Sequence, residues 1–296
     1  MTMDNLPGVP NFELEEFFPR RRGYCLLIPV INENGRITAQ LMRGLRAGVP
    51  KWVDIAVCDG GSTDGSVAPE RLKKLGVRAL LVKTGPGRQG AQLRTGIWWA
   101  LREGYKGILT IDGNNKDSIE SVPRFIEKLR EGYDLVQGSR FVPGGLAVNT
   151  PASRLLAVRA LHAPLTSLAA GHRFTDTTNA FRAYSRQYLT HPAVQPLRNI
   201  FSGYELLAYL STRATQLGLR ACEVPVARVY PKTGKTPTKI KGLAGNWDLL
   251  KILAANAMGA STSRTIRKHI LPNTISVIII SANQMFLPVN SSRAKA

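Results

Sequence analysis

The sequence has few acidic residues for its length. Among 296 residues there are 20 Asp and Glu against 40 Lys and Arg, so the formal net charge is +20. This excess is more than solubility requires and indicates an anionic partner, which is a nucleic acid, an anionic membrane surface or a phosphorylated substrate. Charge alone does not distinguish among these.

Cysteine and histidine are also scarce. The three cysteines, Cys25, Cys58 and Cys222, are far apart and form no C-x-x-C pair, which argues against a disulfide framework. The four histidines show no metal-ligand spacing, so we expect no zinc site. The first 17 residues are polar and do not resemble a secretory signal, so we expect a cytoplasmic protein.

Long apolar runs are missing as well. The most apolar late stretch, residues 275–289, is interrupted by Ser281, Asn283 and Gln284. A spanning helix needs about 18 or more apolar residues, so we expect no membrane-spanning segment. Any membrane contact would then be peripheral, at the cytosolic face.

The central part of the chain alternates short apolar runs with helix-like segments. The runs are rich in Val, Ile and Leu and apolar enough to be covered on both faces, which predicts an α/β fold with a mostly parallel sheet flanked by helices. The predicted strands are residues 24–30, 54–59, 79–83, 107–112 and 134–139. The predicted helices are residues 37–47, 68–75, 89–103 and 118–131.

We expect three parts in the chain. Residues 1–22 form an N-terminal arm whose aromatic residues pack on the domain or on a neighbour, and residues 23–240 form the main domain. Residues 241–296 form a basic amphipathic extension; residues 232–296 hold ten Lys and Arg and one acidic residue. An anionic bilayer, a phosphate-rich acceptor and simple packing on the domain are all compatible with this pattern.

Polar clusters follow the predicted strands, where the binding crevice of a parallel sheet is expected. Asp59 either accepts hydrogen bonds from a nucleobase or ribose, or begins an ordinary turn whose Ser/Thr-Asp residues cap the following helix. Asp112 ends a buried strand, a position suited to metal or phosphate chemistry, with helix capping as the alternative. The clusters are residues 29–33, 59–65, 85–90, 112–117 and 138–140.

Seven segments in this order resemble inverting family 2 glycosyltransferases of the GT-A fold, and within them the polyprenyl-phosphate (dolichol-phosphate) mannosyltransferases. The resemblance covers about residues 24–240. It implies transfer of a sugar, with inversion, from a nucleotide-sugar donor to an acceptor, as in glycan biosynthesis. The segments are residues 28–33, 59–66, 87–97, 112–126, 138–141, 175–186 and 223–240.

The resemblance also implies roles for single residues. Those matching the donor nucleotide site are Pro29, Glu33, Asp59 and Arg88. Those matching positions near the diphosphate, the transferred sugar or the acceptor are Asp112, Arg140, Asp176, Asn179, Arg182, Arg228 and Lys239.

One motif departs from the family pattern. The usual D-x-D-x-Q reads Asp112-Gly113-Asn114-Asn115-Lys116 here. Either Asp112, Asn114 and the donor diphosphate hold Mg²⁺ or Mn²⁺, or Lys116 neutralises the diphosphate in place of a metal. Asp117 is placed to pair with Lys116 and draw it away.

The acceptor decides which catalytic groups are needed. A lipid monophosphate is already anionic, so Asp176 would only position it or stabilise positive charge at the sugar. A saccharide hydroxyl needs a carboxylate base, Asp176 or Asp117. Asp176 is also placed to cap a helix over residues 177–184.

A third hypothesis is a degenerate transferase fold that binds nucleic acid. The altered Asp112 motif and the net charge motivate it, but the sequence shows no nucleic-acid-binding module. The donor base, the sugar and the oligomeric state are not indicated by the sequence.

Overall fold

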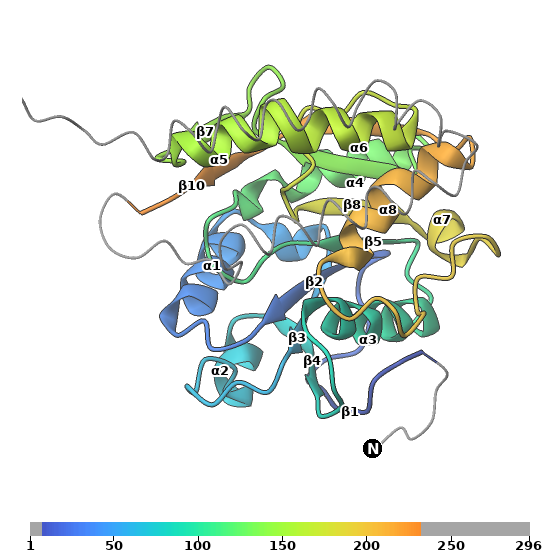
Figure 1. The fold of residues 1–296 in the computed structure, drawn as a ribbon. Coiled ribbons are helices and arrows are strands. Elements are labelled where there is room, and N and C mark those ends of the chain that lie inside the picture. Colours follow the sequence, from blue (N-terminus) through green and yellow to red (C-terminus); the bar gives the residue numbers. More distant parts are fainter. Residues whose placement is uncertain (1–7, 232–296) are drawn as a thin grey trace, which may run out of the picture. The chain divides into compact units, whose positions relative to one another are not determined.

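The computed structural model describes residues 8–231, and within this range the chain forms a mixed eight-stranded sheet covered by helices on both faces (Figure 1). The sheet order is β1-β4-β3-β2-β5-β8-β6-β9. Its strands are β1 (Phe12–Glu16), β2 (Tyr24–Val30), β3 (Asp54–Asp59), β4 (Val77–Lys83), β5 (Gly107–Thr110), β6 (Leu135–Ser139), β8 (Arg182–Ser185) and β9 (Ala221–Pro225).

The sheet is mostly parallel, as the apolar runs predict. β4, β3, β2 and β5 run parallel to one another, and so do β6 and β9. β8 lies between β5 and β6 and is antiparallel to both, which the sequence pattern did not predict. A separate pair of parallel strands, β7 (Leu146–Val148) and β10 (Ala227–Val229), lies beside the main sheet.

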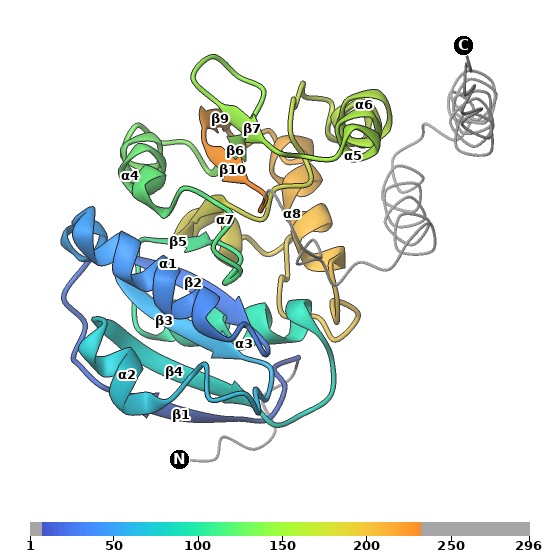
Figure 2. The same cartoon turned by 90° about the vertical axis from the view of Figure 1, so that its left-hand side faces the viewer.

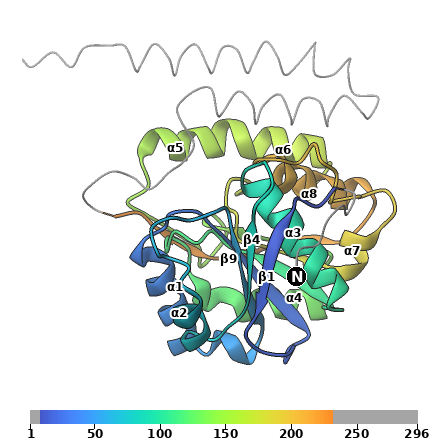
Figure 3. The ribbon, with the colours of Figure 1, turned by 90° about the horizontal axis from the view of Figure 1, so that it is seen from below.

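Helices cover the sheet in two layers (Figures 2 and 3). Residues of α1, α2 and α4 belong to one buried cluster, and residues of α3, α6, α7 and α8 belong to the other. The α-helices are α1 (Gly35–Arg46), α2 (Pro69–Lys74), α3 (Gln89–Arg102), α4 (Val122–Arg130), α5 (Ala152–Ala157), α6 (Ala163–Ala170), α7 (Arg186–Thr190) and α8 (Glu205–Gln216). Two short 3₁₀ helices (Val49–Lys51 and Ile119–Ser121) and a π-helical turn (Val158–His162) complete the set.

Part of the expected N-terminal arm belongs to the sheet. Phe12–Glu16 pairs antiparallel with β4 as an edge strand, with Phe12 opposite Lys83. The Phe12 side chain is buried and meets Trp98 edge to face at 5.8 Å between ring centroids. Residues 12–16 are therefore packed on the domain.

The strand order reverses at β2, the point at which a sheet of this kind is expected to have its binding crevice. From β2 the chain adds β3 and β4 on one side and then places β5 on the other side of β2. Ligands of such sheets bind beyond the carboxyl ends of the strands at this reversal. Glu33 and Asp112 follow β2 and β5, and Asp59 is the last residue of β3, so all three lie at the carboxyl ends of these strands.

No helix among residues 8–231 is long and apolar enough to cross a membrane. The stretch at 275–289 and the basic extension at 241–296 lie outside the described residues.

Candidate active site

The loops after β2 and β3 are bonded to each other. The Asn32 amide N–H donates to Ser62 Oγ at 2.9 Å, and the Thr63 amide N–H donates to Asn32 Oδ1 at 2.8 Å. The Asn34 amide N–H donates to Asp64 Oδ2 at 2.7 Å. These contacts fix the two loops as one wall of the crevice.

Asp59 holds the loop that follows it. Its Oδ2 accepts the backbone N–H of Gly61 (2.9 Å) and of Ser62 (2.8 Å), and its Oδ1 accepts Ser62 Oγ–H at 2.5 Å. The side chain is buried. The ordinary turn is therefore observed, but the following helix α2 begins after Ala68 without a side-chain cap bond. A contact of Asp59 with nucleobase or ribose stays a prediction.

The loop after β5 is shaped by close packing and by α1. A Cβ at Gly113 would lie 3.1 Å from the Pro29 carbonyl oxygen, so the absence of a side chain lets this loop approach β2. Asn115 has a positive φ of 59° and is held by Gln40 Oε1, which accepts its N–H, and by Arg43 Nη1, which donates to its Oδ1, both at 2.8 Å. Asn tolerates this backbone region better than most residues.

Asp112 lies just after β5, at the carboxyl ends of the parallel strands, and its side chain is 20% exposed. Gln89 Nε2 donates to its Oδ1 at 2.9 Å, and its Oδ2 receives Asn114 Nδ2 and Arg228 Nη2, each at 3.3 Å. Burial raises the pKa of Asp112, but the Arg228 and Lys116 cations outweigh it and hold that pKa below its usual range. The carboxylate is therefore ionised at neutral pH.

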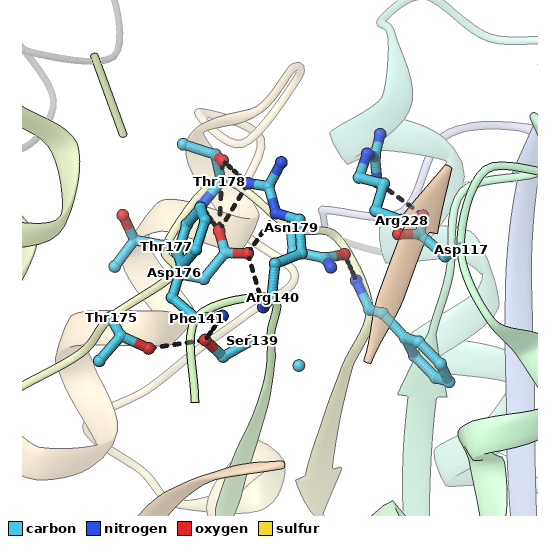
Figure 4. A network of polar contacts seen from close by, with 12 residues as sticks. Asp117, Ser139, Arg140, Phe141, Thr175, Asp176, Thr177, Thr178, Asn179 and Arg228 are labelled. Atoms are coloured by element: carbon cyan, nitrogen blue, oxygen red, sulfur yellow. Dashed lines mark hydrogen bonds and ion pairs between the residues drawn. The ribbon is translucent and has the colours of Figure 1, made fainter. Parts of the chain in front are cut away.

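Asp117 forms an ion pair with Arg228 (Figure 4). Lys116, the partner that the sequence suggested, also interacts electrostatically with Asp117, but its effect on the Asp117 pKa is smaller than that of Arg228. Arg228 Nη1 donates to Asp117 Oδ2 at 2.6 Å, and both side chains are buried. Burial raises the pKa of Asp117 although Arg228 opposes the shift. Arg228, on β10, thus links Asp117 to Asp112 and joins the small sheet to the crevice.

Lys116 is buried beside these groups. Its ammonium lies 5.0 Å from the centroid of the Tyr230 ring, a cation–π contact. Burial, together with the Arg228 cation, lowers the pKa of Lys116 to about 8. Arg154 donates to the Tyr230 hydroxyl at 2.9 Å, which holds the aromatic ring in place.

The two residues predicted to hold a metal do not fit an ion bound by the protein alone. Asn114 directs its amide N–H, not its oxygen, toward Asp112, and its Oδ1 lies 3.3 Å from the Lys116 amide nitrogen, which donates to it. Mg²⁺ and Mn²⁺ prefer several oxygen ligands, and two cations already flank the single carboxylate. Among residues 8–231 no three His, Cys, Asp or Glu residues form a group able to hold a metal.

Arg140 and Asp176, both predicted to act in catalysis, form a buried ion pair (Figure 4). Arg140 Nε donates to Asp176 Oδ2 at 2.6 Å and Nη2 donates to Oδ1 at 2.9 Å. Neither side chain is more than 2% exposed. Glu223 accepts the Asp176 backbone N–H at 3.0 Å and so supports the same loop. Contact of the pair with a substrate stays a prediction.

The segment after Asp176 is not a helix, so the helix-capping alternative for Asp176 is wrong. Residues 177–181 form a loop that leads into β8. Arg182, on that strand, donates to the backbone carbonyls of Thr177, Asn179 and Leu207. These bonds occupy the guanidinium inside the fold and so compete with the predicted role of Arg182 close to the transferred sugar and the acceptor.

The other predicted residues are placed as follows. Pro29 is buried in β2, and Glu33 pairs with Arg36 at 2.9 Å. Arg88 is exposed at the start of α3, where its backbone N–H donates to the Ser202 carbonyl at 2.8 Å. Lys239 lies outside the described residues.

Several side chains at the carboxyl ends of these strands were not indicated by the sequence motifs. Gln92 is buried and donates to the carbonyls of Val30 (2.6 Å) and Cys58 (3.2 Å), which ties the ends of β2 and β3 together. Tyr204 is 38% exposed, and its pKa is raised by burial and by the Asp112 carboxylate. Gln89 and Gln92 lie within residues 87–97, the segment in which the sequence motif indicated only Arg88.

Two named mannosyltransferases are similar to this chain in sequence. No family model matches the chain. The undecaprenyl-phosphate mannosyltransferase of Micrococcus luteus is 32% identical over 213 residues, which cover 71% of this chain and 85% of that protein. The chain belongs to the polyprenyl-phosphate mannosyltransferase family. The polyprenol monophosphomannose synthase of Mycolicibacterium smegmatis is 29% identical over 210 residues, covering 68% of this chain and 75% of that protein.

Solved structures support the fold of this mannosyltransferase-family chain. Glucosyl-3-phosphoglycerate synthase from Mycobacterium tuberculosis, in complex with Mn²⁺, UDP and glucosyl-3-phosphoglycerate, superposes with a TM-score of 0.52 at 19% identity. The match covers 80% of this chain and 78% of that one. The predicted GT-A fold is thus confirmed, and the glycosyltransferase class is confirmed by the mannosyltransferase relatives.

Proposed function

We propose that the protein transfers a hexose from a nucleotide-sugar donor to polyprenyl phosphate, with inversion at the anomeric carbon. The observation that carries the proposal is the cluster of Asp112, Lys116, Asp117 and Arg228 at the crevice edge of a chain that belongs to this family. Asp112 and Asp117 hold the Arg228 guanidinium in place, with the Lys116 ammonium buried beside it, so both cations are positioned before the diphosphate arrives.

In the proposed reaction an oxygen of the acceptor phosphate attacks the anomeric carbon. The bond from that carbon to the diphosphate oxygen breaks, and its electron pair leaves with the nucleoside diphosphate. Lys116 and Arg228 stabilise the charge that develops on the leaving group, an effect strengthened by their burial. The acceptor phosphate is an anion at neutral pH, so the step needs no general base.

The small sheet beside the cluster suits a lipid acceptor. Side chains alternate between faces along a strand, so Arg228 and its neighbour Val229 point to opposite faces of β10. Arg228 is buried toward Asp117, whereas Val229 is 47% exposed, and Leu146 on β7 is 58% exposed. The phosphate of a polyprenyl phosphate would bind the cluster, and its apolar chain would contact the exposed apolar face beside it.

The runner-up is transfer to a saccharide hydroxyl, which needs a carboxylate base. Both predicted bases, Asp117 and Asp176, are fully buried and paired with arginines. This favours the lipid phosphate. Family membership likewise favours an enzyme over the degenerate nucleic-acid-binding fold.

A product assay tests the proposal. The full-length chain is incubated with GDP-mannose, UDP-glucose or UDP-N-acetylglucosamine, with and without undecaprenyl phosphate in detergent. We expect nucleoside diphosphate release, and labelled sugar in the organic phase, only when the lipid phosphate is present. Release that needs a saccharide in place of the lipid phosphate would support the runner-up.

We also propose that the enzyme acts as a peripheral protein at the cytosolic membrane face. The net charge and the exposed apolar residues of the small sheet support this placement. A divalent metal would have to arrive with the donor diphosphate, because the described side chains do not form a metal site on their own.

A further inference from the structure

A second concentration of positive charge lies at the amino ends of the parallel strands, opposite the catalytic crevice at their carboxyl ends. A pocket of about 420 Å³ is lined there by five cationic side chains, those of Arg21, Arg22, Lys51, Lys106 and Arg130. All five are exposed. Like charges gathered in one pocket repel one another, and an anion bound among them would relieve the repulsion.

The pocket is separate from the catalytic crevice. Its wall includes Tyr24, the first residue of β2, which pairs with Gly107, the first residue of β5. The pocket therefore lies at the amino ends of strands whose carboxyl ends form the crevice. A strand of seven residues such as β2 is about 20 Å long, which places the pocket beyond reach of the crevice residues.

The positive charge of the pocket is not neutralised by an acidic lining residue. No carboxylate belongs to the lining within residues 8–231. Asp54 contacts the wall from inside the fold, but its Oδ2 accepts the backbone N–H groups of Arg21 (2.9 Å) and Arg22 (3.0 Å) and the Tyr105 hydroxyl (2.9 Å). Arg22 Nε donates to the Pro50 carbonyl, which orients its guanidinium and leaves its charge in place.

Two aromatic rings of the pocket lining hold the side chain of Arg130. The Arg130 guanidinium lies over the ring of Trp52 at 5.4 Å and over that of Tyr24 at 5.9 Å. A guanidinium stacked in this way keeps its N–H edge available for bidentate bonds to phosphate oxygens. Because Arg130 already covers these rings, the pocket offers phosphate contacts rather than a platform for a nucleobase.

We propose that this pocket binds an anion that bears phosphate groups, at a site independent of the transferase reaction. Two sources can present the same chemistry, a soluble polyphosphate and the headgroup of an anionic phospholipid. The experiment has one arm for each source.

The first arm titrates tripolyphosphate into the full-length protein and follows binding by calorimetry. The test variant is Lys51→Glu with Lys106→Glu, and the matched control is Arg173→Glu with Arg213→Glu, which changes the net charge equally on elements outside the pocket. The crevice is unchanged in all three proteins. We expect one class of binding sites to weaken at least tenfold in the test variant and to be retained in the control.

The second arm measures sedimentation with vesicles of phosphatidylglycerol and, for comparison, phosphatidylcholine. A loss confined to the test variant and to phosphatidylglycerol vesicles assigns the pocket to a lipid headgroup. A loss confined to tripolyphosphate assigns it to a soluble anion. If the test variant matches the control in both arms while its melting temperature is unchanged, the proposal is overturned, and the proposed transferase activity is unaffected.

Discussion

Arg140 and Asp176 bind each other through two parallel hydrogen bonds inside the fold, although both match positions that the family places near the substrate. The bonds measure 2.6 and 2.9 Å, and the Arg140 backbone N–H adds a third contact to Asp176 at 3.2 Å. The pair joins the end of β6 to the loop before β8 and so fixes one side of the crevice.

Removing one member of this pair should destabilise the fold. Asp176→Ala leaves the Arg140 guanidinium buried without its carboxylate, which costs about 3–5 kcal/mol in the free energy of unfolding. Denaturant unfolding measures the change. Glu120→Ala is the control, because it breaks the exposed Arg43–Glu120 pair and should cost about 1 kcal/mol or less.

The same variant distinguishes a positioning role from direct contact with substrate. If Asp176 acts only through the loop, Asp176→Ala loses stability and activity together. An Asp176→Ala protein with unchanged unfolding and no transferase activity would show instead that this carboxylate contacts the reacting groups.

Asp59 should support nucleotide binding through its loop. Asp59→Ala removes the acceptor for two backbone N–H groups and the Ser62 hydroxyl, so we expect nucleoside diphosphate affinity to fall by about 1–3 kcal/mol in calorimetry. Ser62→Ala keeps the carboxylate but removes one loop contact. A similar loss in both variants indicates loop ordering, a larger loss in Asp59→Ala indicates a direct ligand contact, and no loss in Asp59→Ala removes Asp59 from the site.

His162 should make stability fall as the solution becomes acidic. Its imidazole is buried in the π-helical turn, and burial lowers its pKa below the usual value. The unfolded chain therefore binds a proton that the folded chain does not, and the free energy of unfolding decreases as the pH drops below about 6.5.

Denaturant unfolding at pH 7.5 and 5.5 checks this expectation. The decrease on acidification should be smaller in His162→Leu than in the wild-type protein. His191→Leu, a substitution at a less buried histidine, should keep the wild-type decrease. Equal decreases in wild type and His162→Leu would show that His162 does not contribute.

The sequence predicted the parallel core of the fold well, because β2 to β5 and the helices between them follow local apolar periodicity. It did not predict β8, since Arg182–Ser185 pairs with strands far away in the chain and its place depends on tertiary packing. The edge strand β1 was overlooked for the same reason.

The site was predicted in part. Strand-end placement brought Asp59, Asp112 and Glu33 to one edge, since parallel strands deliver their carboxyl ends there. Partners could not be predicted, because Arg228 reaches Asp117 across more than a hundred residues of sequence. Motif matching likewise could not show that Arg182 donates to backbone carbonyls inside the fold.

The Asp112 motif supports a sharper prediction about metal binding. In the free protein, Asp112 is bonded to Gln89, Asn114 and Arg228, and Lys116 lies close enough to lower its pKa. A divalent ion would have to displace these contacts and approach two cations, which is unfavourable at a partly buried site. We therefore expect negligible Mn²⁺ binding in calorimetry without nucleotide and measurable binding once nucleoside diphosphate supplies further oxygen ligands.

Replacing Asn114 and Lys116, the two residues that differ from the family motif, should allow the protein to bind a metal without nucleotide. Asn114→Asp with Lys116→Gln adds a carboxylate and removes one cation, so the double variant should bind Mn²⁺ at least tenfold more tightly than the wild type without nucleotide. Adding Asp112→Asn to the double variant is the control and should abolish the gain, since it removes the central carboxylate. Tight Mn²⁺ binding by the wild-type protein without nucleotide would contradict the prediction. It would mean that Asp112 and Asn114 give up their present hydrogen bonds and bind the ion without the diphosphate oxygens.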